Sequence, residues 1–332
     1  MSIPLAPPET GIRFIHRTGH HCGSSALRDL LEFHGIVLSE AFCFGLGSGL
    51  GISYLAPSGA PVPYMVHVRS LGFEERVLRT FTPSMSWSTF ASGNAAMLAL
   101  DERLDAGFPA LLLTDIFHLP YYGSSTHFPG HAIMAWGRSR ESGDVFVTDT
   151  ERPELLAVPR DKLALARFSN QEPFPHQGNM YSPDSLPLTG SLREAARAAV
   201  RCNAGLLLNG SQCSGIAALG HWREQLPLWA SEVDWRWTTR FAYQLIEKRG
   251  TGGGGFRKMY ADFLDELALL DNEIRNSPLP ALMRKSASAW TQLALTLKVA
   301  SEGERFPLTE LEAAITAVEH AEIHYAQAAL QA

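Results

Sequence analysis

The stretch HRTGHHCGSSALRDLLEFHG (16–35) predicts the first strong helix of the chain. Its leucines recur at helical spacing after Gly23, and Gly35 suits a C-terminal stop. Cys22 therefore stands at the beginning of the helix, where backbone N–H groups point outward and the dipole favours negative charge. Such a place stabilises a thiolate, which is the nucleophilic form of cysteine.

Three apolar runs downstream predict strands: ALLLTD (110–115), HAIMAWG (131–137) and DVFVTDT (144–150). The polar turn at residues 138–143 joins the last two as a hairpin. A short helix is expected over Asp161 to Phe168. One helix followed by a mainly antiparallel sheet is typical of the α+β class.

His131 opens one strand of this hairpin and Asp149 closes the other. If the strands pair, the two side chains lie near each other at one end, and the carboxylate can hold the imidazole in one tautomer. With Cys22 this makes a Cys-His-Asp arrangement for nucleophilic catalysis. The linear order and the elements beneath it match papain-like enzymes. His127 is a rival base, and Asp115 and Asp144 are rivals to the carboxylate.

The four cysteines are too few for a disulfide framework, and no two form a CxxC pair. Cys43 and Cys202 are expected to be inert core residues. Cys213, in NGSQCSG, is a minor rival nucleophile because it also stands near the start of a helix.

Two longer stretches carry a resemblance to a known family. HRTGHHCGSSALRDLLEFHGIVLSEAFCFGLGSGLGISYL (16–55) resembles the N-terminal domain of the butirosin biosynthesis protein H family, and IEKRGTGGGGFRKMYADFLDEL (246–267) is similar to the helical domain that accompanies it. The resemblance implies a papain-like fold of the C39 type. It also implies acyl transfer from a carrier-protein thioester to an amine, in natural-product biosynthesis.

Residue roles follow from the resemblance position by position. It implies that Cys22 is the nucleophile, His131 the general base and Asp149 the group that orients the imidazole. His16 stands six residues before Cys22, where papain-like sequences commonly carry a glutamine that donates to the oxyanion. A histidine can also donate such a bond, so His16 is a candidate for that role.

The change in composition and in hydrophobic spacing along the chain predicts two domains. Residues 1–170 form the papain-like domain with the Cys/His/Asp site, 171–187 a proline-rich linker, and 188–332 a helical domain. The formal net charge of −6 disfavours a nucleic-acid partner. No apolar stretch is long enough to span a bilayer and none resembles a signal peptide, so no membrane partner and a cytoplasmic location are expected.

The glycine run 250–255 is not a nucleotide-binding P-loop, because Phe256 and Arg257 follow it instead of Lys and Ser or Thr. Flanked by Arg249, Arg257 and Lys258, it is a candidate site for the phosphopantetheine phosphate of a carrier protein. An ordinary turn between helices explains it equally well.

No metal or organic cofactor is expected. His20 and His21 beside the cysteine are interpreted as loop residues, because adjacent side chains rarely point the same way. His320 and His324 lie one turn apart on a predicted helix, but no third ligand accompanies them.

Three functions remain open at this point. The first is transfer of an acyl group from an acyl carrier protein to a small amine. The second is use of the same cysteine for hydrolysis or cyclisation, as a peptidase, amidase, thioesterase or cyclase. The third is a non-catalytic binding or scaffold protein that keeps the fold.

Overall fold

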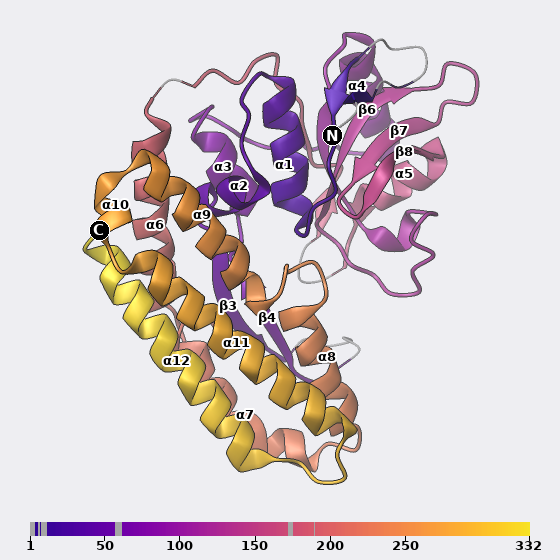
Figure 1. Ribbon diagram of the computed structural model, residues 1–332. Helices are drawn as coiled ribbons and strands as arrows, with labels where there is room; N and C mark the ends of the chain where they lie inside the picture. The colour runs from indigo at the N-terminus through magenta and orange to yellow at the C-terminus, as the bar shows by residue number, and fades with distance from the viewer. Residues whose placement is uncertain (1–3, 6, 8–11, 57–61, 172–174, 189) are drawn as a thin grey trace. The chain divides into compact units, whose positions relative to one another are not determined.

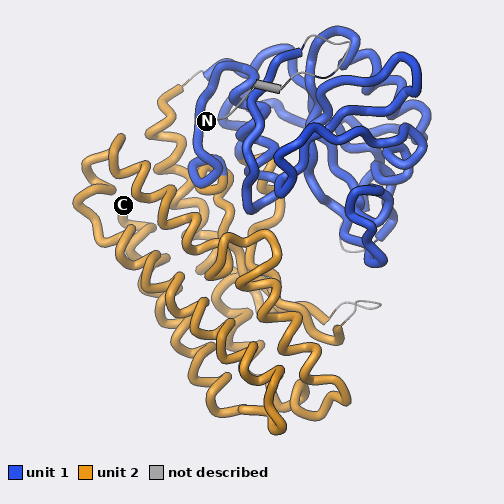
Figure 2. The backbone as a smooth tube through the Cα atoms, turned by 45° about the vertical axis from the view of Figure 1, so that its right-hand side comes forward, with its two compact units in different colours: residues 1–43, 77–189 blue, residues 44–76, 190–332 orange. Residues whose placement is uncertain are grey.

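The computed structural model describes residues 4–5, 7, 12–56, 62–171, 175–188 and 190–332 (Figure 1). The chain forms two compact units, Met1–Cys43 with Val77–Thr189 and Phe44–Arg76 with Gly190–Ala332 (Figure 2). Helices and strands are both present and the main sheet is antiparallel, which agrees with the α+β class. Every helix of the described residues is too short or too polar to cross a membrane.

The first unit contains most of the strands. Its elements in chain order are β1 (Pro4–Leu5), β2 (Phe14–Ile15), α1 (Cys22–Phe33), α4 (Gly93–Asp105), β5 (Ala110–Thr114), the 3-10 turn η1 (Ile116–His118), β6 (His131–Arg138), β7 (Val145–Asp149), β8 (Arg152–Val158), α5 (Arg160–Ala166), β9 (Phe168–Ser169), β10 (His176–Gln177) and β11 (Met180–Tyr181). Two short helices, α2 (Glu40–Leu46) and α3 (Phe73–Arg79), span the points where the chain passes from one unit to the other.

A five-stranded antiparallel sheet forms the framework of this unit, in the order β11-β5-β6-β7-β8. The expected hairpin is present, because β6 pairs with β7 from Arg138 opposite Val145 to Met134 opposite Thr148. The expected helix after Cys22 and the short helix near residue 161 are also present as α1 and α5. The helix expected to begin at Cys22 and the two strands expected to carry His131 and Asp149 are therefore all present.

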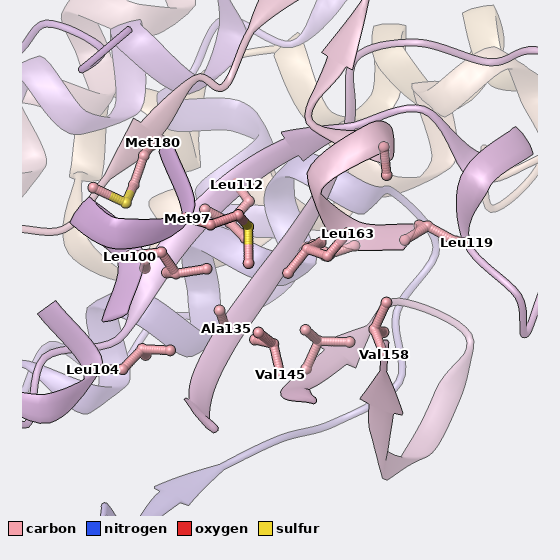
Figure 3. Packing of buried hydrophobic residues seen from close by; sticks show 14 residues of the cluster. Met97, Leu100, Leu104, Leu112, Leu119, Ala135, Val145, Val158, Leu163 and Met180 are labelled. Atoms are coloured by element: carbon pink, nitrogen blue, oxygen red, sulfur yellow. The ribbon is translucent and has the colours of Figure 1, made fainter. Parts of the chain in front are cut away.

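Alternating side chains give the sheet two buried faces. On one face, Ala135 and Val145 join a cluster with Met97 of α4 and Leu163 of α5 (Figure 3). On the other, Trp136 stacks on Phe14 with ring centroids 3.8 Å apart and meets Phe33 of α1 edge-on at 6.0 Å. The α1 helix is thus packed firmly on the sheet, and its N-terminus has a fixed place.

The second unit is a helical bundle with one hairpin. Its elements are β3 (Leu50–Leu55), β4 (Met65–Arg69), α6 (Leu192–Leu208), α7 (Ala217–Ser231), α8 (Trp235–Glu247), the 3-10 turn η2 (Gly254–Phe256), α9 (Arg257–Leu270), α10 (Asn272–Asn276), α11 (Leu279–Glu302) and α12 (Leu308–Leu330). The long helix α11 packs on α8, α9 and α12.

The division into units corrects the expected domain boundaries in two places. Residues 44–76 belong with the helices and not with the sheet, because β3 and β4 pack on α6, α7 and α8. The Asn203 side chain of α6 even pairs with both backbone groups of Leu50. The expected linker 171–187 is also more than a crossing, since its Met180 and Tyr181 pair with β5 as the edge strand β11.

Candidate active site

Cys22 is the first residue of α1, as the sequence predicts. His21 is the N-cap residue, and its Nδ1 accepts the backbone N–H of Ser24 at 3.1 Å. The Cys22 residue is 8% exposed, so it lies just below the surface of the unit. A sulfur in this place faces the positive end of a 12-residue helix.

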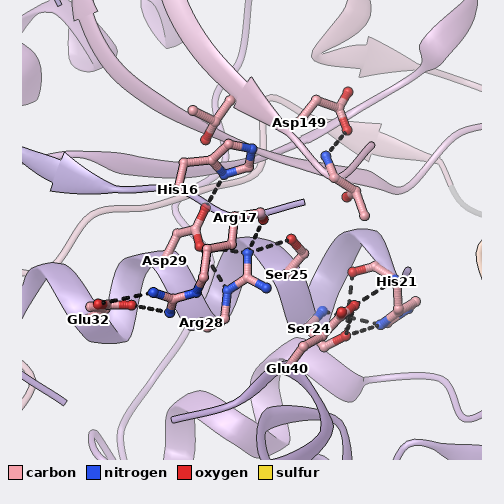
Figure 4. Close-up of polar contacts among 12 residues, drawn as sticks. His16, Arg17, His21, Ser24, Ser25, Arg28, Asp29, Glu32, Glu40 and Asp149 are labelled. Atoms are coloured by element: carbon pink, nitrogen blue, oxygen red, sulfur yellow. Dashed lines mark hydrogen bonds and ion pairs between the residues drawn. The ribbon is translucent and has the colours of Figure 1, made fainter. Parts of the chain in front are cut away.

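The loop before Cys22 is fixed by Glu40 (Figure 4) and by Thr150, the residue that follows strand β7. The Glu40 carboxylate accepts the backbone N–H groups of His20 and His21 at 2.8–3.1 Å and the Ser24 hydroxyl at 3.3 Å. The backbone N–H of Gly19 donates to the carbonyl of Thr150 at 2.7 Å. That bond joins the cysteine loop to the residue that follows Asp149, so the two parts of the site share one support.

His131 and Asp149 form a buried pair. Nε2 of His131 lies 2.9 Å from both carboxylate oxygens of Asp149, and the two side chains are 8% and 0% exposed. Asp149 also accepts the backbone N–H of Thr150 at 2.6 Å. The Cys22 side chain forms a hydrogen bond with His131 as well. Because Nε2 faces the carboxylate, Nδ1 is the ring nitrogen left for the sulfur.

The electrostatics of the pair favour an imidazolium. Burial alone would lower the pKa of His131, but the Asp149 charge and the hydrogen bonds with Asp149 and Cys22 raise it to about 10. Burial would likewise raise the pKa of Asp149, and the facing His131 outweighs it and lowers that pKa to about 2. A carboxylate and a protonated ring therefore face each other at neutral pH.

Two tyrosines complete the site, and no sequence pattern predicts a role for either. The Tyr121 hydroxyl donates to Oδ2 of Asp149 at 2.7 Å, and the Tyr122 hydroxyl lies 3.2 Å from Nε2 of His131. Burial and the Asp149 charge raise the pKa of both hydroxyls far above the usual tyrosine value, so both stay protonated. They sit in the loop that leads from β5 to β6, where no periodic pattern distinguishes one residue from another.

His16 does not have the place expected for an oxyanion donor. Its Nδ1 contacts Oδ2 of Asp29 (Figure 4), and its Nε2 lies 2.7 Å from the carbonyl of Arg152. Asp29 is held in turn by the Arg28 guanidinium at 3.0 Å. Both ring nitrogens of His16 are thus engaged, and no N–H is left for a substrate. The residue joins the segment before α1 to the start of β8.

The rival residues also have defined places. His127 pairs through Nδ1 with Oδ2 of Asp115 at 2.7 Å, so these two rivals hold each other instead of Cys22. Cys43 is fully buried, as expected for an inert thiol. The prediction for Cys202 is wrong, since this residue of α6 is exposed, as is Cys213.

The expected phosphate contacts are also wrong for Arg257. Its guanidinium is fully buried, pairs with Glu322 at 2.8 Å and donates to the carbonyls of Val68 and Gly255. Lys258 pairs with Glu247 at 3.0 Å. Arg249 lies over the ring of Phe241, and burial lowers its pKa. All three cations therefore contact residues of the helical bundle itself. The glycine run makes a turn, with left-handed backbone at Gly250 and Gly252–Gly255.

Comparison with known families matches two segments of the chain. Residues 21–150 match the family described as "Butirosin biosynthesis protein H, N-terminal". This segment is therefore a domain of the butirosin biosynthesis protein H-like family. Residues 161–329 match a second family, described as "Domain of unknown function (DUF4872)". No curated protein matched the chain in a comparison of sequences.

The family match has a direct bearing on the site. The matched segment 21–150 contains Cys22, His131 and Asp149, and it also contains both tyrosines of the connecting loop. Membership links the chain to biosynthesis of the butirosin type and suggests an enzyme.

Proposed function

We propose that this protein is a cysteine-dependent acyltransferase with a papain-like fold of the C39 type. It moves an acyl group from a carrier-protein thioester to a small amine. The observation that carries the proposal is the chain of contacts from Cys22 through His131 to Asp149 at the N-terminus of α1. A helix bearing the cysteine, packed on an antiparallel sheet that bears the histidine and the acid, supports the papain-like interpretation.

The first half-reaction forms an acyl-enzyme. His131 holds the thiol proton, and the Cys22 sulfur attacks the carbonyl carbon of the thioester. The bond from that carbon to the phosphopantetheine sulfur breaks, and the leaving thiolate takes the proton from His131. Exchange between two thioesters is easy because the entering and leaving thiolates have similar basicity. The backbone N–H of Cys22 is the oxyanion donor that the helix N-terminus offers.

The second half-reaction releases the product. The amine attacks the acyl carbon, His131 accepts the proton that the nitrogen loses, and the bond to the Cys22 sulfur breaks. Asp149 keeps the ring in one orientation through both steps, as its two 2.9 Å contacts with Nε2 support. Tyr121 fixes the carboxylate in turn.

Mass spectrometry of the intact protein tests the proposal. The protein is mixed with an acyl-carrier thioester, first without and then with a primary amine. We expect an acyl adduct on the wild type that is missing in Cys22→Ala and that amine converts to an amide. Cys202→Ala is the matched control, because it removes an exposed thiol elsewhere and should keep the adduct.

The other outcomes separate the alternatives. Free acid in place of amide would make the protein a hydrolase, and a cyclic product from an acyl chain with its own amine would make it a cyclase. No adduct with any acyl group would leave the scaffold function and end the proposal.

A further inference from the structure

A second cluster of polar side chains lies in the first unit, on the loop between β5 and β6. Asp115, His118 and His127 place one ligand atom each within 4.8 Å of one another. Among the residues that the structure describes, this is the one group of three or more such side chains with that spacing. None of the three belongs to the Cys22 site, so the cluster needs its own explanation.

The carboxylate of the cluster is held in place from behind. Asp115 is fully buried, and its Oδ1 accepts the backbone N–H groups of Phe117 and Phe128 at 3.1 and 3.0 Å. Its Oδ2 accepts the Ser169 hydroxyl at 2.9 Å and faces Nδ1 of His127 at 2.7 Å. Such outer hydrogen bonds orient the ligands in protein metal sites.

The imidazole rings of His118 and His127 lie beside the Asp115 carboxylate. The His127 ring stacks on Phe117 with centroids 4.1 Å apart, which fixes its plane. The half-buried His118 ring contacts the His127 ring at 5.9 Å, and within the described part of the chain no hydrogen bond reaches either of its nitrogens. The charge of Lys162 acts on His118, and Lys162 also forms an ion pair with Asp161 at 3.6 Å.

We propose that Asp115, His118 and His127 form a binding site for Zn²⁺. Two imidazole nitrogens with one carboxylate oxygen suit zinc and its first-row neighbours, whereas Mg²⁺ and Ca²⁺ prefer all-oxygen sites. Three protein ligands leave the fourth tetrahedral position for water. Around tetrahedral zinc two ligand atoms lie roughly 3.3 Å apart, so the 2.7 Å contact of His127 with Asp115 has to open by about 0.6 Å. Binding displaces the proton shared between them.

The ion would close the loop between β5 and β6 at both ends. Asp115 and His118 stand where the loop leaves β5, and His127 stands just before His131. Tyr121 lies between them and donates to Asp149. A zinc ion would therefore join the two ends of the loop that carries Tyr121 and Tyr122 of the Cys22 site. The proposed zinc site does not depend on the proposed acyl transfer.

Cobalt absorption tests this assignment directly. The whole protein, stripped with a chelator, is titrated with Co²⁺, and Zn²⁺ is then added to displace it. We expect one saturable ion per chain, with the intense visible bands of four-coordinate cobalt and no sulfur-to-cobalt charge-transfer band. We also expect Zn²⁺ to raise the melting temperature, since it binds the folded state.

Variants locate the ion. His118→Ala removes a ring without a hydrogen bond, so the protein should fold normally, and both it and His127→Ala should weaken Zn²⁺ binding by more than roughly tenfold. Ser169→Ala, which loosens only the carboxylate, should also weaken it. His320→Ala with His324→Ala is the control, because these exposed histidines of α12 are one turn apart and can bind zinc adventitiously.

Three results would overturn the proposal. They are binding unchanged in His118→Ala, a charge-transfer band that shows a thiolate ligand, and no saturable binding to the wild type. Binding lost only in the α12 control would assign the ion to that helix instead.

Discussion

At the scale of single residues, the Asp149 carboxylate decides the charge of the site. The pKa of His131 is about 10 in the folded protein and 6.5 in the unfolded chain. Because the folded value is higher, the stabilisation from the protonated ring is complete below pH 6.5 and is lost as the pH rises to about 10. The wild type should therefore lose unfolding free energy across this range, on the order of a few kcal/mol.

Asp149→Asn tests that dependence. The amide removes the charge that raises the pKa of His131, so urea unfolding at pH 6.5 and pH 10 should give more similar free energies in the variant than in the wild type. Equal slopes against pH in both proteins would show that Asp149 does not control the protonation of the ring.

Tyr121 offers a second test at this scale. Tyr121→Phe removes one hydrogen bond to a buried carboxylate and leaves the ring in place. The unfolding free energy should fall by about 1–3 kcal/mol. Tyr243→Phe in α8 is a matched control in the other unit and should change little. Similar losses in both variants would assign the effect of Tyr121→Phe to packing.

The sequence predicts a contact between two side chains where both lie on recognisable strands, as His131 and Asp149 do. His131 and Asp149 stand at the ends of two paired strands, and pairing alone brings them together. His16 was placed by its distance from Cys22, but its ring is held by Asp29 and by Arg152, which is 136 residues away. No spacing within a short stretch reveals such a partner, and the same holds for Tyr121.

At the scale of elements, the N-terminus of α1 depends on Glu40. This carboxylate accepts the backbone N–H groups of His20 and His21, and a Cβ at Gly19 would lie 2.8 Å from its Oε2. A side chain at position 19 would therefore displace the Glu40 carboxylate from its present place. A negative charge here also meets the positive end of the helix dipole.

Glu40→Ala should weaken this end of the helix. It leaves two backbone donors without their charged acceptor, and we expect a loss of about 1–3 kcal/mol in unfolding free energy by urea denaturation. Glu154→Ala, at an exposed position of β8, is the control and should change stability by less than about 0.5 kcal/mol. Equal effects of the two substitutions would mean that Glu40 does not support α1.

At the scale of the whole molecule, the units do not follow the order of the chain. Residues 44–76 are rich in glycine like the rest of the first half, so the sequence predicts that they belong to the first domain. The structure puts them with the helices, because Asn203 pairs with Leu50 and the buried Arg257 donates to the carbonyl of Val68. Composition does not report such partners, which lie more than 150 residues away.

A fragment of residues 190–332 alone should therefore be unstable. Without β3 and β4 the bundle loses apolar cover, and Arg257 loses two of its acceptors, the carbonyls of Gly51 and Val68. We expect a broad thermal transition and rapid proteolysis, compared with a sharp transition in the full chain. A cooperative transition of the fragment at the temperature of the full chain would show that the helices fold without residues 44–76, as the sequence predicts.

The central claim is that the imidazole of His131 activates the Cys22 sulfur, and the rate of alkylation by iodoacetamide tests it most directly. Cys22 is only 8% exposed, yet it should react faster at pH 7 than the exposed Cys202 of the same molecule. In His131→Ala the alkylation rate at Cys22 should fall by roughly tenfold or more. In His127→Ala the rate at Cys22 should not change, and the rate at Cys202 should be the same in all three proteins. A Cys22 that reacts more slowly than Cys202, and equally in all three proteins, would contradict the account.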